Sequence, residues 1–576
     1  MSANYETRTR YAGLATSACL LLAAAGTAGA QVVLAPSQPQ IGSSNPVTAE
    51  PPVPRPHTQA CVVALFQNLE FADFTPKAFS YTPPAACPGP WAKVVFTADF
   101  TVTAGRQFDR TAAFYLGHAS LYYGTTAEPR AALSPSWHVE RDVTDLTAVF
   151  RTTQTGEANL GNFVGVSNGV TYNGLIYANA ALEFYPESHQ DRAPRTADLV
   201  VPVNGGGGDA GTLNTTTDQV SQTLSLPRNV ERAYLDVIAQ SQSNDEFWYF
   251  CVPNDQTIKL ESCGNTPFRE TEVTIDGQPA GVAPVYPWIF TGGIDPFLWE
   301  PLPGVQTLDF KPYRVDLTPF AGLLADGNSH VLALSVYNAD SYFLATANLL
   351  VFTDHGAAQV SGGLLGNTLT TAPTPVVTEN IQQSGSTFTG SITVSSDRNF
   401  AISGYLNTSH GRVDTTVEQS VRFLNTQVFD VSPTVDGQNA RQTTSVDSLV
   451  TTSNGWGTKT REQHFSYPLV VDYRLTFNAD GSSSQVTSVE QQDHLRTSDY
   501  GDDSSESALD EEVKSTDTLL LSPSFSITGN SGAVATHSYR STDSSGRCYS
   551  RTLTAQMQKL TAVQGGGDCG GDDAQR

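Results

Sequence analysis

The stretch "RLTFNADGSSSQVTSVEQ" (residues 474–491) contains two runs in which apolar and polar side chains alternate, joined by Asp480-Gly481. Alternation with a period of two is typical of a strand with one buried face, and Asp-Gly is a preferred turn of β-hairpins. The same alternation recurs in "SGSTFTGSITVSS" (384–396) and "DTTVEQSVRFLN" (414–425). Helical patterns are almost absent, so the sequence predicts an all-β protein.

The chain has 576 residues, which is enough for two to four domains with full cores. Shifts in composition predict a Pro-rich lead-in (31–56) and two adjacent jelly-roll or β-sandwich domains (57–190 and 196–356). A further β-rich C-terminal domain (370–576) is expected to follow. Within it, the acidic run "YGDDSSESALDEEV" (500–513) is expected to be a solvated loop.

The N-terminus predicts a cleavable signal peptide over residues 1–30. Arg8 and Arg10 precede a short apolar stretch, and small residues lead up to a predicted cut after Ala30. That stretch is short for a transmembrane helix, and no other long apolar run follows. The protein is therefore expected to be secreted or periplasmic, without a membrane anchor.

The formal net charge is −25, and removal of residues 1–30, which carry a net +1, leaves −26. A surface this acidic repels polyanions. Nucleic acid and anionic lipid are therefore excluded as expected partners.

Of the seven cysteines, Cys19 lies in the predicted leader, which leaves six. In an oxidising compartment six cysteines favour three disulfides, for which sequence alone allows 15 connectivities. We expect the three local pairs, Cys61–Cys87, Cys251–Cys263 and Cys548–Cys569.

Two catalytic motifs occur in contexts that do not support them. "GVSNG" (165–169) matches the nucleophile elbow and "GGGGDAG" (205–211) contains a dinucleotide-binding pattern, but strand-like sequence follows both where a helix is required. The histidines lack metal-ligand spacing. We therefore expect no metal and no other cofactor, and carboxylate chemistry or plain binding remains.

Two carboxylates are candidates for that chemistry. Asp109 lies between Phe108 and Arg110 at the mouth of a predicted strand, and Glu246 directly precedes Phe247. An aromatic neighbour raises the pKa of an acid by desolvation, whereas an adjacent arginine favours the ionised form. The residues alone leave two roles open, catalysis and salt bridges that close loops.

A series of motifs resembles the peptide:N-glycosidase A family, and the resemblance covers residues 51–356, with a weaker extension at "NFAISGYLNTSHG" (399–411). The motifs are "QFDRTAAFYLGHASLYYGTTAEP" (107–129), "W-x-V-x-R-DVT" (137–144), "LPRNVERAYLDV" (226–237), "NDEFWY" (244–249), "PFRE" (267–270), "VTIDGQPAG" (273–281), "FTGGIDPFLWEPLPG" (290–304) and "ANLLVFTDHG" (347–356). The resemblance implies a secreted or vacuolar enzyme that hydrolyses the glycan–asparagine amide of N-glycopeptides or N-glycoproteins without a metal.

A more distant resemblance, to the flavobacterial peptide:N-glycosidase F, implies which acids act. Its catalytic aspartate segment is similar to "FDRTAAFY" and implies Asp109, and its second acid implies Glu246. Its third acid falls near "GVSNGV", where only Asn168 is available, so the third acid stays open.

Amide hydrolysis requires that water attack the side-chain carbonyl and that the leaving glycosylamine receive a proton. We expect Asp109 to activate the water, with Glu246 from the second domain positioning it or acting as the acid. The expected substrate-binding residues are Arg110, Trp248, Arg269, Trp288, Asp295 and Trp299.

Three alternatives remain open from the sequence. The substrate-binding candidates are also compatible with ordinary core aromatics and surface ion pairs, and for Trp288 and Trp299 the two interpretations are about equal. The whole chain is compatible with an inactive secreted carbohydrate-binding protein. It is also compatible with an endoglycosidase that uses two carboxylates to cut inside the chitobiose core.

Overall fold

The computed structural model describes residues 31–167, 169–205, 209–501, 504–567 and 569. The all-β class is confirmed, since the α-helices of this part are two four-residue turns, α1 (Thr147–Phe150) and α2 (Ala321–Leu324). None of its helices is long and apolar enough to cross a membrane. The predicted signal peptide lies outside the described residues.

The first block is a sandwich of two antiparallel four-stranded sheets. One has the order β1 (Cys61–Phe71), β10 (Ile176–Pro186), β3 (Trp91–Val102), β6 (Ser136–Asp142). The other has the order β2 (Lys77–Tyr81), β7 (Gln154–Asn159), β4 (Thr111–Leu116), β5 (Ala119–Thr125). A separate hairpin and two short helices complete the described part of the block: β8 (Gly165–Ser167), β9 (Val170–Tyr172), η2 (Thr144–Leu146) and α1.

The second block is a similar sandwich. Its five-stranded sheet consists of β11 (Leu199–Val203), β19 (Asp340–Thr353), β14 (Val230–Ser241) and β17 (Tyr313–Asp316), with β12 (Gly211–Thr215) also paired to β19. Its four-stranded sheet has the order β13 (Val220–Ser225), β18 (Ser329–Tyr337), β15 (Glu270–Ile275), β16 (Gln278–Pro284). Its short 3-10 helices are η3 (Ser243–Asp245), η4 (Trp248–Phe250), η5 (Pro296–Trp299) and η6 (Thr318–Phe320).

The C-terminal part forms one large sheet of eleven strands, in which each strand pairs with its sequence neighbour from β22 onward. Side chains alternate between buried and exposed along these strands, as the period of two predicts. The predicted turn at Asp480-Gly481 is present, with the Gly481 N–H donating to the Asn478 carbonyl over 3.0 Å. The strands are β20 (Ser361–Asn367), β21 (Val376–Ser384), β22 (Thr387–Thr408), β23 (Gly411–Ser432), β24 (Val435–Asn454), β25 (Gly457–Phe477), β26 (Ser483–Tyr500), β27 (Ser505–Leu521), β28 (Ile527–Asp543), β29 (Cys548–Gln556) and β30 (Lys559–Gly567).

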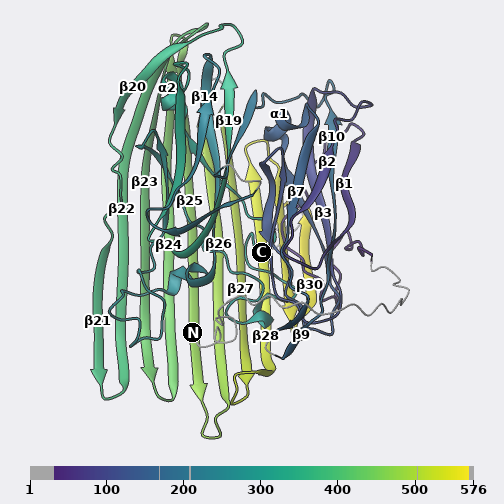
Figure 1. The fold of residues 1–576 in the computed structure, drawn as a ribbon, viewed down its shortest axis with the longest axis vertical. Coiled ribbons are helices and arrows are strands. Elements are labelled where there is room, and N and C mark those ends of the chain that lie inside the picture. The colour runs from purple at the N-terminus through teal and green to yellow at the C-terminus, as the bar shows by residue number, and fades with distance from the viewer. Residues whose placement is uncertain (1–30, 168, 206–208, 502–503, 568, 570–576) are drawn as a thin grey trace, which may run out of the picture.

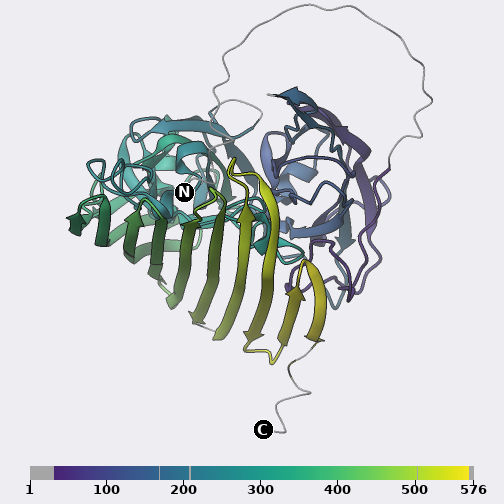
Figure 2. The ribbon, with the colours of Figure 1, turned by 90° about the horizontal axis from the view of Figure 1, so that it is seen from below.

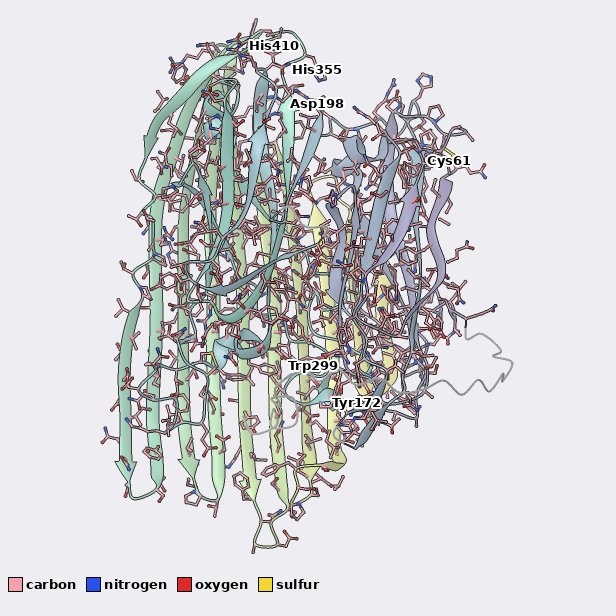
Figure 3. The ribbon with its side chains drawn as sticks, in the orientation of Figure 1. Cys61, Tyr172, Asp198, Trp299, His355 and His410 are labelled. Atoms are coloured by element: carbon pink, nitrogen blue, oxygen red, sulfur yellow. A yellow bond between two sulfur atoms is a disulfide. The ribbon has the colours of Figure 1, made fainter. Side chains whose placement is uncertain are left out.

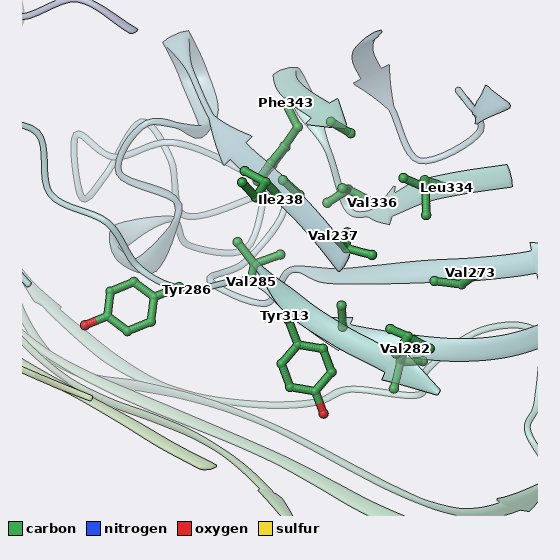
Figure 4. Close-up of a cluster of buried hydrophobic side chains, with 14 of the residues drawn as sticks. Val237, Ile238, Val273, Val282, Val285, Tyr286, Tyr313, Leu334, Val336 and Phe343 are labelled. Carbon is green, nitrogen blue, oxygen red and sulfur yellow. The ribbon is translucent and has the colours of Figure 1, made fainter. Parts of the chain in front are cut away.

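The two sandwiches lie side by side on one face of the large sheet (Figures 1 and 2). Aromatic side chains of the second block reach that face: Tyr313 packs on Phe465 with ring centroids 5.1 Å apart. The Tyr286 hydroxyl donates to the Gln492 carbonyl over 3.1 Å. Figure 4 shows both tyrosines at the rim of the apolar cluster between the sheets of the second block, which also contains Val237. The core is therefore continuous from the second sandwich into the large sheet.

The lead-in runs extended across the junction of these parts. The Gly42 N–H donates to the Leu560 carbonyl over 2.7 Å, and the Leu560 N–H donates to the Ser43 carbonyl over 2.9 Å. The Val47 N–H donates to the Pro301 carbonyl over 2.9 Å. The lead-in therefore joins the edge of the large sheet to the second block.

The expectation of a solvated loop over residues 500–513 is wrong. Residues from Ser505 onward form β27, and Glu511 is only 2% exposed. Buried and more exposed side chains alternate along β27 from Glu511 onward, so every second side chain points toward the covered face, where Glu511 accepts a hydrogen bond from His537. A run of acids therefore did not exclude a strand.

The three local disulfides are present as expected: Cys61–Cys87, Cys251–Cys263 and Cys548–Cys569. The jelly-roll topology and the domain boundaries at 57–190, 196–356 and 370–576 stay predictions.

A cluster of charged side chains lies where the lead-in, the second block and the large sheet meet. The Lys311 ammonium nitrogen is 3.4 Å from Glu50 Oε2. The Ala49 N–H donates to His537 Nδ1 over 3.2 Å, which leaves the ring proton on Nε2 to be donated to Glu511 over 2.8 Å. Asp309 and Asp493 also act on these groups, so the cluster holds more acids than bases.

Burial is the largest cause of shifted pKa values in this cluster. It raises the pKa of Glu50 and Glu511 from 4.5 to about 7, and that of Asp493 from 3.8 to about 7. It lowers the pKa of His537 from 6.5 to about 4. The folded state thus retains carboxyl protons that the unfolded chain loses. These three carboxyls stabilise the fold at low pH. Their contribution is lost as pH rises from their pKa values in the unfolded chain through about 7, their pKa in the folded state. The histidine acts in the opposite direction below pH 6.5, but three carboxyls outweigh it.

We expect Glu511→Gln to flatten the fall in thermal stability between the unfolded pKa of 4.5 and the folded pKa of about 7, because the amide keeps the His537 contact without titrating. Unfolding temperatures across this pH range measure the effect, with the exposed Glu506→Gln on the same strand as control. An unchanged pH dependence in Glu511→Gln would contradict the assignment.

Candidate active site

Asp109 and Glu128 lie at the same end of one β-hairpin. Asp109 precedes β4 and Glu128 follows β5, and the register pairs Thr111 with Thr125. Continued outward, this register places position 109 opposite position 127, so Glu128 is one residue further along the neighbouring strand. The Asp109 N–H lies 3.4 Å from Glu128 Oε2, and the Glu128 side chain is 15% exposed.

A glycine loop, residues 290–299 of the second block, closes over this end of the hairpin. The Gly292 N–H donates to Asp109 Oδ2 over 2.7 Å, and the Glu128 N–H donates to the Thr291 hydroxyl over 2.8 Å. The Thr291 hydroxyl in turn donates to the Thr126 carbonyl over 2.8 Å. A Cβ at Gly292 would lie 2.1 Å from Glu128 Oε2 and 3.3 Å from Asp109 Oδ2. Both carboxyls therefore flank Gly292 so closely that a side chain there would displace one of them.

The two acids perturb each other. Burial raises the pKa of Asp109, while the Gly292 N–H and the Arg110 guanidinium oppose that rise. The pKa of Glu128 is raised to about 7, first by burial and then by the charge of Asp109, with Arg130 acting in the opposite direction. Two carboxyls this close favour a state that shares one proton. The donors around Asp109 favour the charge there and the proton on Glu128.

Hydrogen bonds connect this end of β4 to the strand that leads to Glu246. The Gln240 amide of β14 donates to the Thr111 hydroxyl over 2.9 Å, and the Gln242 amide reaches the same hydroxyl over 3.2 Å. Thr111 is two residues from Asp109, and Gln242 is four residues from Glu246. Glu246 itself is half-buried.

The glycine loop touches the Glu246 segment from the other side. A Cβ at Gly293 would lie 3.3 Å from a ring carbon of Phe247, the neighbour of Glu246. Adjacent loop residues, Gly292 and Gly293, thus contact the acid pair and the Glu246 segment. That Asp109 and Glu246 share a water or the substrate amide stays a prediction.

Asp245, the other acid of "NDEFWYF", has a different environment from Glu246. Its side chain is fully buried. Its Oδ1 lies 2.9 Å from Nε and 2.8 Å from Nη2 of Arg269. Its second oxygen accepts the Asp340 N–H over 2.6 Å. Arg269, expected to bind substrate, also donates to three backbone carbonyls, so its contacts here are structural. A substrate contact by Arg269 stays a prediction.

Two predicted aromatic ligands, Trp248 and Trp288, are 0% and 4% exposed. Trp248 packs on Phe423 of the large sheet, with ring centroids 6.3 Å apart. Trp288 stacks on Phe310 at 4.1 Å. Both rings lie in the core beneath the loops, and their contact with substrate stays a prediction.

Trp299 and Asp295 hold the glycine loop in shape. The indole N–H of Trp299 donates to the Gly293 carbonyl over 2.9 Å, and the Asp295 carboxylate accepts the Phe297 N–H over 2.9 Å. Asp295 is 0% exposed and Trp299 is 2% exposed. Figure 3 places Trp299 and Tyr172 at the same end of the molecule, opposite the end that carries His355 and His410.

Partly exposed aromatic and basic side chains lie beside Asp109. The Arg106 guanidinium lies 5.8 Å from the Phe108 ring and 5.4 Å from the Tyr172 ring. Arg110, the remaining predicted ligand, lies 5.5 Å from the Phe108 ring. Tyr172 ends the β8–β9 hairpin, whose sequence contains the rejected "GVSNG" motif. The described residues of this motif are indeed strand and turn, and Tyr172, which pairs with Gly165, contacts the Phe108 ring at 5.3 Å. Asn168 itself is outside the described residues.

Glu128 is the site residue that sequence reasoning missed. The signal was present in the Gly117-His118 turn, since counting outward from it along the hairpin, with the bulge between Phe114 and Tyr115, places residue 127 opposite Asp109 and Glu128 one residue further on. The described residues contain no group of three or more His, Cys, Asp or Glu side chains arranged to hold a metal ion.

The fold and the paired carboxyls define a β-sandwich protein equipped for acid–base hydrolysis. A family profile described as Peptide N-acetyl-beta-D-glucosaminyl asparaginase amidase A matches residues 50–369, and the chain belongs to this family. The resemblance seen in the sequence is thereby confirmed.

One relative and two solved structures illustrate the similarity. Peptide-N4-(N-acetyl-beta-glucosaminyl)asparagine amidase A of Prunus dulcis is 29% identical over 400 residues, covering 66% of this chain and 68% of the relative. PNGase F from Flavobacterium meningosepticum aligns at a TM-score of 0.34 with 13% identity, covering 51% of this chain and 96% of that one. PNGF-II aligns at 0.36 with 13% identity, covering 52% and 66%. These TM-scores are too low for residues to be transferred by superposition.

We expect Asp109→Asn to lower the pKa of Glu128 from about 7 toward its usual 4.5, because the substitution removes the neighbouring negative charge. Infrared difference spectra of protein with isotope-labelled glutamate, recorded across pH, measure this. Asp397→Asn, an exposed site on the large sheet, serves as control. A Glu128 pKa that stays unchanged in Asp109→Asn would show that the two acids are not coupled.

Proposed function

We propose that this protein hydrolyses the amide between the innermost GlcNAc and asparagine of N-glycopeptides or N-glycoproteins, releasing the glycan and leaving aspartate. The activity for which the Prunus dulcis relative is named and the family match support this reaction. The observation that carries it is the Asp109–Glu128 pair held against the backbone of Gly292. A protein that only binds sugar does not require two adjacent carboxyls with raised pKa values.

In the proposed reaction, ionised Asp109 removes a proton from water as the oxygen attacks the side-chain carbonyl carbon of asparagine. The C–N bond breaks, and the glycosylamine leaves with a proton that Glu128 or Glu246 supplies. The Gly292 N–H and Arg110 favour the ionised form of Asp109 against the effect of burial, so the proton is assigned to Glu128. Two carboxyls with separated pKa values are the arrangement that acid–base catalysis requires.

Glu246 is assigned to positioning water or to donating the proton. It is half-buried, and it follows the strand that is bonded to Thr111 through Gln240 and Gln242. Phe247 next to it packs toward Gly293 and limits access of bulk water.

We assign substrate contact to the aromatic side chains beside Asp109. Phe108 and Tyr172 are partly exposed, and aromatic faces pack well on sugars. Arg106 and Arg110 add positive charge to an otherwise acidic surface. Secretion is part of the proposal as well, because disulfides persist in oxidising compartments.

We expect digestion of a defined N-glycopeptide in heavy-oxygen water to convert the glycosylated asparagine into aspartate carrying one heavy oxygen, because the attacking water supplies that atom. Mass analysis of the peptide measures it. An endoglycosidase would instead leave one GlcNAc on asparagine, and a binding protein would leave the substrate intact.

In the same assay Asp109→Asn should lower glycan release by about 100-fold or more, because general-base catalysis contributes about that much. Glu128→Gln and Glu246→Gln should each lower it, and Asp397→Asn should not. An Asp109→Asn variant with near-wild-type turnover would show that another group is the base.

Gly292→Ala should impair glycan release while leaving the unfolding temperature nearly unchanged. Its Cβ would meet Glu128 Oε2 at 2.1 Å and push that carboxyl away from Asp109. Turnover number and KM measure the loss, which should fall mainly on turnover. The control is Gly529→Ala, where a Cβ meets nothing within 4 Å. Full activity in Gly292→Ala would show that the pair tolerates separation.

A further inference from the structure

The glycine loop is attached to the large sheet along most of its length. Gln485 of β26 donates to the Ile294 carbonyl over 3.0 Å, and the Ser515 hydroxyl of β27 donates to the Leu298 carbonyl over 2.8 Å. Phe297 packs in a small apolar cluster formed by four residues of the sheet, Tyr473, Leu475, Leu519 and Leu521. The loop that touches Asp109 is therefore held by strands far from it in sequence.

Two carboxyls meet in this attachment. Asp295 of the loop is 0% exposed, and Asp517 of β27 is 2% exposed. One oxygen of each is used, since Asp295 Oδ1 accepts the Phe297 N–H and Asp517 Oδ1 accepts the Asn530 amide over 2.9 Å. The remaining Oδ2 atoms are both buried and have no other hydrogen-bond donor. Two buried acids in contact are stable only when they share a proton.

The pair acts on the acid site through one tight turn. The Asp295 N–H and the Trp299 indole N–H both donate to the Gly293 carbonyl, at 2.7 and 2.9 Å. Gly292, whose N–H contacts Asp109, is the next residue. A displacement of Asp295 would therefore move the donor that holds the proposed base.

We propose that Asp517 is a positioning residue, which through a proton shared with Asp295 docks the glycine loop on the large sheet and so places the Gly292 N–H against Asp109. The inference rests on the proposed function for its catalytic part. Asp517 lies outside residues 50–369, the span matched by the family profile, so the large sheet completes a site built by the first two blocks.

The proton makes the dock sensitive to pH. Burial first, and Asp517 second, raise the pKa of Asp295 to about 8, with the Phe297 N–H and, less strongly, Arg130 opposing the rise. Burial also raises the pKa of Asp517, with Asn530 opposing it. The pair stabilises the docked loop while it holds its proton, and that contribution is lost as pH rises through about 8.

The test combines hydrogen exchange with kinetics on the full chain. Hydrogen exchange of the backbone amides of residues 288–300 is compared with that of β14 at about pH 6 and about pH 9. These two values lie below and above the pKa at which the pair loses its shared proton. The variants are Asp517→Asn, which keeps a neutral donor to Asp295, Asp517→Ala, which removes it, and Asp510→Asn, a partly exposed site on the same strand, as control.

Wild type should lose protection in the loop segment, relative to β14, at the higher pH. In Asp517→Asn the loop should stay protected at both pH values, because the Asn amide donates a hydrogen bond to Asp295 without a shared proton. Asp517→Ala should lose protection at both and lower turnover by about 10- to 100-fold with KM changed less than about twofold, as expected when a base is misplaced. Asp510→Asn should behave as wild type.

Equal exchange and turnover in Asp517→Ala and wild type would overturn the proposal. So would a loop in Asp517→Asn that loosens with pH as wild type does, and this second comparison remains decisive if Asp517→Ala fails to fold. Exchange is measured without substrate. A wild-type protein that releases no glycan would therefore overturn the proposed function alone.

Discussion

One face of the large sheet has to be covered, and most of the architecture follows from that constraint. Its longest strands have 22 residues, about 70 Å of extended chain, with alternate side chains buried on the same face, many of them apolar. Leaving such a face in water would forfeit the burial that drives folding. The two sandwiches cover it side by side, so their connecting loops are confined between three rigid parts (Figure 2). The candidate site lies among these loops.

The covered face also supplies what the loops lack. Loop carbonyls have no ladder partners, and leaving them unpaired in the interior would be costly. Amide side chains of the large sheet donate to them: Asn425 to Tyr249, Gln438 to Phe250, Gln427 to Cys251, Gln491 to Pro287 and Gln485 to Ile294. The sheet therefore works as a template for the loops beside Glu246 and Gly292, beyond its role as a cover.

The sequence predicted what depends on local pattern, and failed where distant segments meet. Period-two alternation and the Asp480-Gly481 turn were sufficient for the all-β class, and short spacing was sufficient for the three disulfides. Glu128 needed the hairpin register, which places it beside Asp109. Neighbouring acids looked equivalent, yet Asp245 is buried against Arg269 while Glu246 is half-buried. No local pattern relates Asp295 to Asp517, since their contact depends on how the large sheet packs on the second block.

The contacts between the parts share one chemical character, because several of them bury more acids than bases. Glu511 lies at the junction of the lead-in and the large sheet, Glu128 beneath the glycine loop, and Asp295 between that loop and β27, each with a pKa raised mainly by burial. Each contact therefore keeps a proton that the unfolded or separated parts would release. In a protein with a net charge of −25, ionised carboxyls at these contacts would otherwise repel one another. Retained protons remove that repulsion locally. Packing of the three parts against one another and protonation of the acid pair are therefore both favoured by low pH.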